Sequence, residues 1–297
     1  MKKGRKKTSV ANITFVIVNS IVLTLFCAIT LYPILNTLAV SLNEGMDALK
    51  GGIYLWPRKL TLENYYKVFN KDNLMTAFTV SVARTVIATF LHMILTALIA
   101  YVLARKEFLF GKQVSLFFVL TMYVNGGLVP TFLLFKSLHL TNTFWVYIIP
   151  GMISAFNMIV IRTYMNSLPD SFVESAQVDG AGHLKIFFRI IMPLCKPVMA
   201  TVALFIAVGQ WNSWFDAMYF NMNRPDLTTL QFELQKLLTS VSMQSGSSSM
   251  MQGAADAVTP VSIRSATAIF TALPIVALYP FLQRYFITGM MIGGVKE

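Results

Sequence analysis

Charged residues are scarce in this sequence: only 12% of its 297 residues are Asp, Glu, Lys or Arg, whereas 56% are hydrophobic. Soluble domains normally carry about 25% charged residues, so a water-soluble globular protein is excluded. The mean hydropathy of +0.62 supports the same conclusion. We therefore expect an all-α membrane protein.

Cysteine and histidine are also rare, with two cysteines and three histidines in the chain. Cys27 lies within an apolar run and Cys195 beside a polar segment, so the sequence predicts two reduced thiols and no disulfide framework. The three histidines, His92, His139 and His183, lack the close spacing of metal ligands. No metal site is expected.

Motifs for catalysis and nucleotide binding are missing. The chain has no G-x-x-x-x-G-K-[ST], no H-E-x-x-H and no G-x-S-x-G string, which argues against a membrane-embedded enzyme and against ATP binding by this chain. No catalytic residue is expected. An ion-coupled secondary transporter normally has several acidic or histidine residues in its spans, and this chain offers only Asp216 and His92. A non-catalytic transport subunit remains the favoured class.

Six apolar runs are long enough to cross about 30 Å of hydrocarbon. They cover residues 13–40, 74–104, 114–134, 144–165, 197–220 and 265–286. Asn125, Gly126, Gly127 and Pro130 interrupt the third run, and Pro274 and Pro280 lie in the sixth. Neighbouring helices can satisfy the backbone groups that proline frees, so the sequence predicts six transmembrane helices.

The distribution of Lys and Arg predicts the orientation of these helices. With the amino terminus in the cytoplasm, more than half of the basic residues fall in inside segments, which are 2–7, 105–112, 162–196 and the tail from Arg284. Both termini are therefore expected to be cytoplasmic, and the net charge of +11 is assigned to membrane topology rather than to nucleic-acid binding. The apolar run after "MKKGRKK" is about twice as long as that of a signal peptide, which predicts a retained first helix.

The polar stretch at 221–264 is predicted to be an extracellular loop. Its part "LTTLQFELQKLLTSV" has leucines at helical spacing and indicates a short amphipathic helix. The following "SMQSGSSSMMQGAADAVTP" is rich in serine, glycine and alanine and predicts a flexible strap.

The segment "ESAQVDGAGHLKIFFRIIMPL", residues 174 to 194, is too polar to cross a membrane. It predicts a short helix with Asp170 or Ser171 as its cap, and a turn at Asp179 and Gly180 ends that helix because glycine adopts left-handed backbone angles. A second helix follows, with Leu184, Phe187, Phe188 and Ile191 on its apolar face and Lys185 and Arg189 on another. We expect this segment to lie along the cytoplasmic face and to offer part of itself to a partner.

This segment resembles the coupling loop of importer-type ABC transporter permeases. That loop reads E-A-A, two residues, D-G-A, five residues, F, two residues, I, one residue, L-P, three residues and P. The chain matches it at Glu174, Ala176, Asp179, Gly180, Ala181, Phe187, Ile190, Pro193 and Pro197, and departs from it at Ser175 and Met192. The strings "NGGLVPTFLL" and "QWNSWFDAMYF" extend the likeness to the maltose-type carbohydrate permeases, with the branch for complex oligosaccharides most similar.

The resemblance implies a type I ABC importer permease fold in the cell membrane. Residues 1–73 would hold the cytoplasmic amino terminus, the first helix and an extracellular loop. Residues 74–286 would form the permease core, with the coupling loop at 166–194 and the long extracellular loop at 221–264, and residues 287–297 the cytoplasmic tail. The implied partners are a second homologous permease, two ATPase subunits, an extracellular sugar-binding protein, membrane lipid and an oligosaccharide. ATP and Mg would be bound by the ATPase subunits, and no cofactor by this chain.

Two groups of site residues follow from the resemblance. The residues expected to couple to the ATPase are Glu174, Ser175, Ala176, Asp179, Gly180, Ala181 and Pro193. The alternative for Glu174 is that it merely caps or solvates its helix. The residues of a possible substrate path are Tyr123, Asn125, Asn157, Gln210, Trp211, Asn212, Trp214 and Asp216.

The path residues of the fifth run are predicted to form two stripes of one helix. Gln210, Trp214 and Ala217 fall on one stripe, and Asn212, Asp216 and Tyr219 on the other. Aromatic rings and amides are the groups that bind sugars, but the alternative is an interfacial aromatic belt with Asp216 paired to Arg84 or Arg264. Asn157 can instead join helices, Gly126 and Gly127 can serve close packing, and in this family the partner permease can supply most sugar contacts.

Overall fold

The computed structural model describes residues 10–70, 73–244 and 258–292. These residues form helices and turns with one isolated β-bridge, between Asn43 and Leu60, and no strand among them, which confirms the all-α expectation. The chain forms two compact units. One contains Met1–Asn70 with Leu237–Phe270, and the other Lys71–Lys236 with Thr271–Glu297.

The first unit is built on α1 (Val10–Ser41), followed by α2 (Gly45–Leu49) and α3 (Glu63–Phe69). The segment after α2 folds back along α1, because the Asn36 amide donates to the carbonyls of Ile53 at 2.7 Å and Tyr54 at 3.0 Å. The Asn64 amide donates to the Ser41 carbonyl at 2.8 Å and so joins α3 to the end of α1. Side-chain amides therefore hold this loop together with the isolated bridge and the hydrogen bonds of Arg58 to Asp47 and Gly51.

The second unit contains most of the remaining elements. They are α4 (Leu74–Ala104), α5 (Gly111–Thr121), α6 (Leu128–Ser137), the 3-10 turns η1 (Phe144–Tyr147) and η2 (Ile149–Gly151), α7 (Ala155–Met165), α8 (Ser171–Val178), α9 (His183–Ile186), the π-helical η3 (Phe187–Ile191), α10 (Met192–Leu194), α11 (Lys196–Asn212), α12 (Phe215–Phe220) and η4 (Pro225–Leu227). The helices α13 (Leu230–Gln244) and α14 (Pro260–Ile292) contribute residues to both units.

Three helices are long and apolar enough to cross a membrane, namely α1, α4 and α14, over Asn12–Ser41, Leu74–Ala104 and Pro260–Leu278. Two bent pairs raise the number to five if each is one span: Phe144–Gly151 with Ala155–Met165 at 48°, and His183–Leu194 with Lys196–Asn212 at 86°. The third predicted span is not one continuous helix. It divides into α5 and α6, because Gly127 has a φ of 85° that interrupts the helix.

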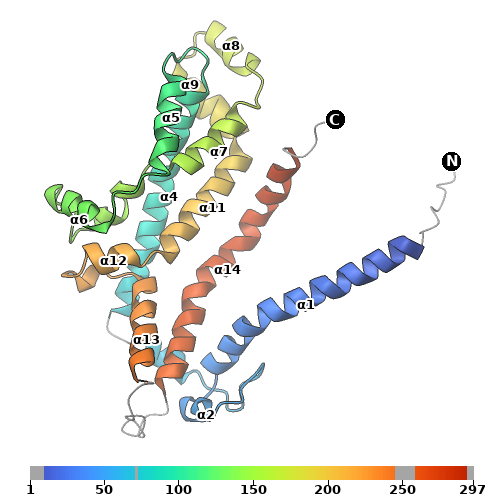
Figure 1. The fold of residues 1–297 in the computed structure, drawn as a ribbon, viewed down its shortest axis with the longest axis vertical. Coiled ribbons are helices and arrows are strands. Elements are labelled where there is room, and N and C mark those ends of the chain that lie inside the picture. Colours follow the sequence, from blue (N-terminus) through green and yellow to red (C-terminus); the bar gives the residue numbers. More distant parts are fainter. Residues whose placement is uncertain (1–9, 71–72, 245–257, 293–297) are drawn as a thin grey trace. The chain divides into compact units, whose positions relative to one another are not determined.

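The helices α4, α7 and α11 pack together as the centre of the second unit (Figure 1). Small residues of α4 allow this close approach, since Ala88, Ala97 and Ala100 are fully buried. Figure 1 shows α8 and α9 at the Ala104 end of α4 and α12 nearer its Leu74 end. Residues 166–194, the predicted coupling loop and called the coupling segment below, and the "QWNSWFDAMYF" string therefore lie toward opposite ends of α4.

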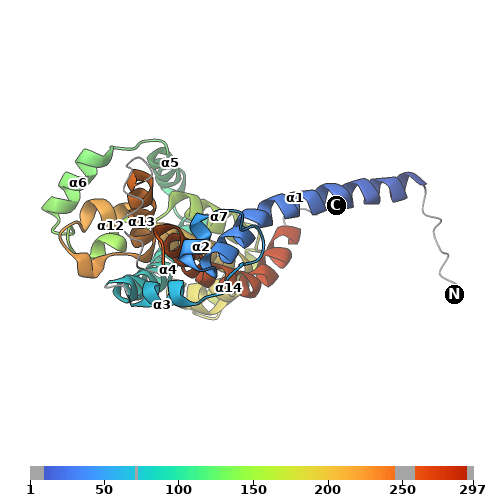
Figure 2. The same ribbon diagram turned by 90° about the horizontal axis from the view of Figure 1, so that it is seen from below.

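Two outlying parts follow the sequence closely. Figure 2 shows α6 beside α12, where the Phe135 and Phe220 rings pack edge to face with centroids 4.9 Å apart. The predicted amphipathic helix is α13, with Leu230 and Leu234 buried. The predicted strap lies largely outside the described residues.

Candidate functional site

The coupling segment presents one face of α8 to solvent. Val173 and Ala176 are buried against the unit, whereas Glu174 is exposed. Two apolar side chains accompany it on the outside, with Phe172 42% and Val178 88% exposed. Large exposed apolar side chains beside a carboxylate are typical of a surface that another protein covers.

The turn after α8 has the geometry that its glycine predicts. Gly180 has a φ of 76°, and the Gly180 amide donates to the Gln177 carbonyl at 2.9 Å. The Ala181 amide donates to the Ala176 carbonyl, also at 2.9 Å, so both groups satisfy carbonyls at the end of the helix. Gly180 therefore determines how α9 leaves α8.

Asp170 holds α8 in a way that differs from its predicted role. It occupies the N-cap position but makes no capping hydrogen bond. Its carboxylate instead accepts from Lys106 Nζ at 2.5 Å. The Lys106 ammonium lowers the pKa of the Asp170 carboxyl, and the carboxylate raises the pKa of Lys106. This exposed pair joins the start of α8 to the loop that follows α4.

The second helix of the segment does not have the single apolar face that its spacing predicted. Phe187 and Ile191 are fully buried, with Phe187 against Tyr101 at a centroid distance of 5.4 Å, while Leu184 and Phe188 are 67% and 48% exposed. The reason is the π-helical turn η3, which shifts the register. Proline at 193 lacks an amide hydrogen and cannot donate to the residue-189 carbonyl, which favours this wider turn.

A buried ion-pair cluster forms around Arg84 of α4. Arg84 is 1% exposed and donates to both carboxylate oxygens of Asp216, at 2.5 and 3.1 Å. Arg84 also donates twice to Gln210 Oε1, at 2.8 and 3.0 Å, and lies 4.4 Å from the centroid of the Tyr147 ring. The Ser213 hydroxyl donates to Asp216 at 2.9 Å. Asp216 thus has the structural partner Arg84, one of the two alternatives considered for it.

The two predicted stripes of the fifth run are wrong because the helix is broken. Ser213 is extended, with a φ of −75° and a ψ of 125°, so α11 ends at Asn212 and α12 begins at Phe215. The break exposes the Ser213 carbonyl, which accepts from Arg84 Nη1 at 3.3 Å. Gln210 and Asp216, expected on different stripes, therefore meet at the same guanidinium.

A polar pit of about 180 Å³ lies between α4, α7 and α11, next to this cluster. It is lined by His92, Thr96, Gly151, Ser154, Asn157, Phe205, Ile206, Gly209 and Gln210. His92 Nε2 donates to the Ile148 carbonyl at 2.8 Å. Asn157 and Gln210 were predicted from the sequence, whereas His92, Thr96 and Ser154 were not. The sequence did hold one signal for these missed residues, because His92 and Thr96 are polar and lie one helical turn apart within an apolar run.

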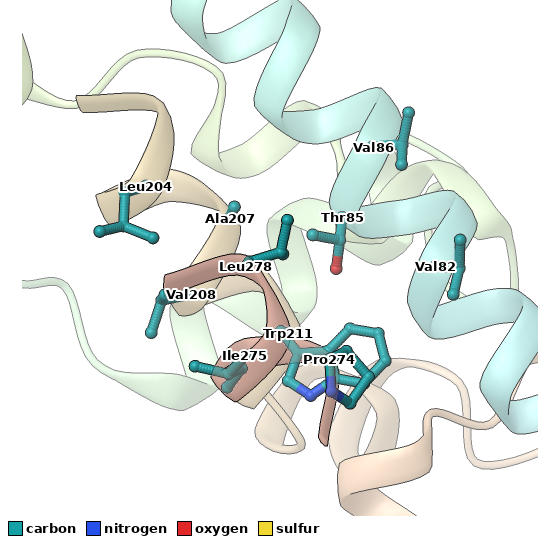
Figure 3. Close-up of a pocket in the computed structure, with 10 residues that line it drawn as sticks. All are labelled: Val82, Thr85, Val86, Leu204, Ala207, Val208, Trp211, Pro274, Ile275 and Leu278. Atoms are coloured by element: carbon teal, nitrogen blue, oxygen red, sulfur yellow. The ribbon is translucent and has the colours of Figure 1, made fainter. Parts of the chain in front are cut away.

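An apolar groove of about 210 Å³ lies on another face of α4 and α11, where α14 takes the place of α7 (Figure 3). Its walls are Val82, Thr85 and Val86 of α4, Leu204, Ala207, Val208 and Trp211 of α11, and Pro274, Ile275 and Leu278 of α14. The Trp211 indole donates to the Thr271 carbonyl at 2.9 Å and is 6% exposed. Trp211 is therefore a packing residue in this structure and lies away from the pit.

The other predicted path residues do not join the pit. Tyr123 is 82% exposed at the end of α5, and the Asn125 carboxamide accepts from the Gly127 amide at 2.9 Å in the turn before α6. Asn212 is exposed, and Trp214 is half-buried with its ring 6.1 Å from that of Phe215. The structure thus brings Asn157 and Gln210 together at the pit, connects Asp216 to Gln210 through Arg84, and leaves the remaining predicted residues apart.

Comparison with known proteins gives the family of this chain. The sequence matches, over residues 93–292, the family described as binding-protein-dependent transport system inner membrane component. The polygalacturonan/rhamnogalacturonan transport system permease protein YtcP of Bacillus subtilis is 34% identical over 275 residues, which cover 92% of this chain and 95% of that one. The arabinooligosaccharides transport system permease protein AraQ of Halalkalibacterium halodurans is 29% identical over 276 residues, covering 90% and 92%.

A solved structure is similar over nearly the whole chain. It is a chain of the crystal structure of a bacterial ABC transporter involved in the import of the acidic polysaccharide alginate. The TM-score is 0.86 at 27% sequence identity, and the match covers 95% of this chain and 100% of that one. The chain therefore belongs to the family of binding-protein-dependent transport system inner membrane components.

Proposed function

We propose that this chain is the permease subunit of an ABC importer that brings complex, acidic oligosaccharides into the cell from an extracellular binding protein. The observation that carries the proposal is the 34% identity to a polygalacturonan/rhamnogalacturonan permease over 92% of the chain. The likeness to a transporter of the acidic polysaccharide alginate supports the same substrate class. In this proposal the chain forms part of the path of the oligosaccharide across the membrane, and the partner ATPase subunits supply the energy by hydrolysing ATP.

The proposed topology has six spans with both termini in the cytoplasm. The helices α1, α4 and α14 supply three spans, the bent pair Phe144–Gly151 with Ala155–Met165 supplies a fourth, α11 with α12 a fifth, and α5 with α6 the remaining one. The division into residues 1–73, a permease core at 74–286 and a tail at 287–297 goes with this topology. The excess of Lys and Arg in the inside segments supports the orientation.

The proposed partners are a second homologous permease, two ATPase subunits that bind ATP and Mg, and a sugar-binding protein outside the cell. The coupling loop at 166–194 would enter a cleft of an ATPase subunit. Glu174 would pair with a basic residue there, since charge-assisted hydrogen bonds are strong and directional. The neighbouring Phe172 and Val178 would supply apolar contact, because both are exposed. Ser175, Ala176, Asp179, Gly180, Ala181 and Pro193 would maintain the shape of the loop.

The test is gentle solubilisation of the tagged chain from its native membrane, followed by identification of the subunits that copurify. ATP hydrolysis by this complex is then measured with its binding protein and a panel of acidic and neutral oligosaccharides. We expect a second permease and an ATPase to copurify, with hydrolysis stimulated most by an acidic oligosaccharide. Recovery of the chain alone, under conditions that preserve a known ABC importer, would contradict the proposal.

A further inference from the structure

The polar pit between α4, α7 and α11 contains a buried hydroxyl and a side-chain amide that have no hydrogen-bond partner in the described residues. Thr96 is fully buried, and its hydroxyl oxygen has no hydrogen bond. Asn157 is 7% exposed and lines the same pit, and its side-chain amide has no hydrogen bond to a described residue. An unmet buried polar group costs about 1–3 kcal/mol, so the Thr96 hydroxyl, beside an amide that opens on the same small pit, indicates that a polar ligand occupies it at some stage.

The surrounding groups complete a set suited to hydroxyls. Because Arg84 has only donors, Gln210 must turn its carbonyl oxygen toward Arg84, which leaves its amide nitrogen free to donate. That nitrogen lies toward Gly151, where an added Cβ would be 4.0 Å from it. His92 donates through Nε2 to a backbone carbonyl, so Nδ1 of the neutral ring is an acceptor. A sugar hydroxyl donates and accepts at once and can use both kinds of group.

The pit carries no free positive charge in the described residues around it. Arg84, the cation next to it, is engaged by both carboxylate oxygens of Asp216. A carboxylate ligand would therefore find no charged partner, whereas a hydroxyl needs none. The volume of about 180 Å³ is below the roughly 300–1,000 Å³ of pockets for drug-sized ligands, so the pit can take part of an oligosaccharide and not the whole of it.

The polar residues that line the pit argue against its facing lipid. Phe205, Gly209 and Gln210 border the pit, whereas Leu204, Val208 and Trp211 border the apolar groove of Figure 3, so the two hollows lie on different faces of one helix. Polar groups exposed to hydrocarbon are costly, so the face with His92 and Asn157 has to meet water or protein.

From these observations we propose that the pit formed by His92, Thr96, Ser154, Asn157 and Gln210 is a subsite for the hydroxyl groups of one sugar residue in transit. This rests on the proposed function. Asp216 and Arg84 act as positioning residues, because they orient Gln210. The subsite binds hydroxyl groups, which acidic and neutral sugars share. It therefore assists the passage of any such sugar through the permease and does not select sugars that carry a carboxylate.

A filling experiment tests the subsite. A Cβ at Gly209 meets nothing within 4 Å, so Gly209→Leu places a side chain in the pit from a helix that tolerates it. The matched control is Ala207→Leu, two residues away on the apolar groove. A second variant, Asn157→Leu, removes the side-chain amide of Asn157 from the pit. Each variant is assembled with the partner permease, the ATPase subunits and the binding protein in proteoliposomes, and uptake of labelled oligogalacturonides and of a neutral arabino-oligosaccharide is measured.

We expect Gly209→Leu to lower uptake about tenfold or more, and Asn157→Leu to lower it about threefold to tenfold, as for the loss of one hydrogen bond. Each variant should lower the uptake of acidic and neutral substrates by the same factor, for any substrate that the wild-type complex imports. Both variants should still assemble and show stimulated ATP hydrolysis, and Ala207→Leu should take up substrate at nearly the wild-type rate.

Uptake by both pit variants at the wild-type rate would overturn the subsite and leave the proposed function standing. Loss of assembly in Gly209→Leu alone would overturn it too, by showing that the partner permease fills the pit. A wild-type complex that imports no oligosaccharide would overturn the proposed function first.

Discussion

Arg84 of α4 and Asp216 of α12, separated by 132 positions in the sequence, form a two-point ion pair beside the break between α11 and α12. The Arg84 side chain is 2% exposed and that of Asp216 is 19% exposed. Such a pair stabilises the fold mainly because removal of either member leaves the other charge buried without a partner. Arg84 of this pair also donates to Gln210, which lines the pit, so the ion pair connects helix packing to the geometry of the pit.

Asp216→Asn should lower the stability of the chain and its rate of uptake. The change is isosteric but leaves the Arg84 charge without a counterion, which we expect to cost about 3 kcal/mol, the low end for buried pairs because Asp216 keeps some exposure. Thermal unfolding of the purified complex measures this loss. The double variant Arg84→Met, Asp216→Leu should lose much less stability than Asp216→Asn alone. Equal losses in the two variants would contradict the ion-pair explanation.

Glu174→Lys should uncouple ATP hydrolysis from transport while membrane insertion stays normal. The substitution reverses a charge on the exposed face of α8 and alters no apolar run. Insertion, copurification of the ATPase and sugar uptake are measured on the same preparation. Glu107→Lys is the control, since Glu107 is exposed but lies outside the coupling segment. Normal uptake in Glu174→Lys, or equal loss in Glu107→Lys, would count against a specific role for Glu174.

Gly180→Ala should destabilise the turn after α8, whereas Gly182→Ala should not. An added Cβ meets nothing within 4 Å at either position, so only the backbone angle distinguishes them. Gly180 has a φ of 76° and Gly182 a φ of −70°, and the left-handed angle costs a residue with a Cβ roughly 1–2 kcal/mol. Hydrogen exchange of the 171–186 segment should speed up in Gly180→Ala only. Similar exchange in both variants would remove the conformational argument.

The pair Lys106 and Asp170 should stabilise the start of α8 over a wide pH range. The pKa of Asp170 is lowered in the fold, so its contribution is present above the unfolded value of about 3.9 and is lost as pH falls through the folded value. The pKa of Lys106 is raised, so its contribution is lost only as pH rises through a value above about 10.4. The difference in melting temperature between wild type and Asp170→Asn should therefore be constant from about pH 5 to 9 and vanish in acid. A maximum near neutral pH would point to another group.

The local parts of the fold were predictable from the sequence. The second apolar run, 74–104, coincides with α4, and the leucine spacing before residue 241 predicted α13. Gly180 forms the predicted left-handed turn. In each case the signal lies within a few residues of the feature, as periodicity and backbone preference require.

The features that sequence reasoning missed depend on residues far apart in the chain. "QWNSWFDAMYF" reads as a continuous helix, and the break at Ser213 is favoured by hydrogen bonds from Arg84. The wide turn η3 depends on packing against Tyr101 as well as on Pro193. Thr96 and Ser154 were missed because hydroxyls within helices and at helix caps are common, and only the fold brings these two to one pit.

The loop that the Asn36 side chain holds against α1 covers the end of this helix. It therefore shortens the part of α1 that is exposed to lipid. From Asn36 onward the helix is mostly covered, while the side chains from residue 12 to 35 are exposed. That exposed part measures roughly 36 Å at 1.5 Å per residue. A bilayer core of about 30 Å accommodates it with a moderate tilt, whereas the full helix to Ser41 would need a steeper one. The loop that the Asn36 amide helps to hold thereby leaves a shorter apolar length of α1 for lipid to cover.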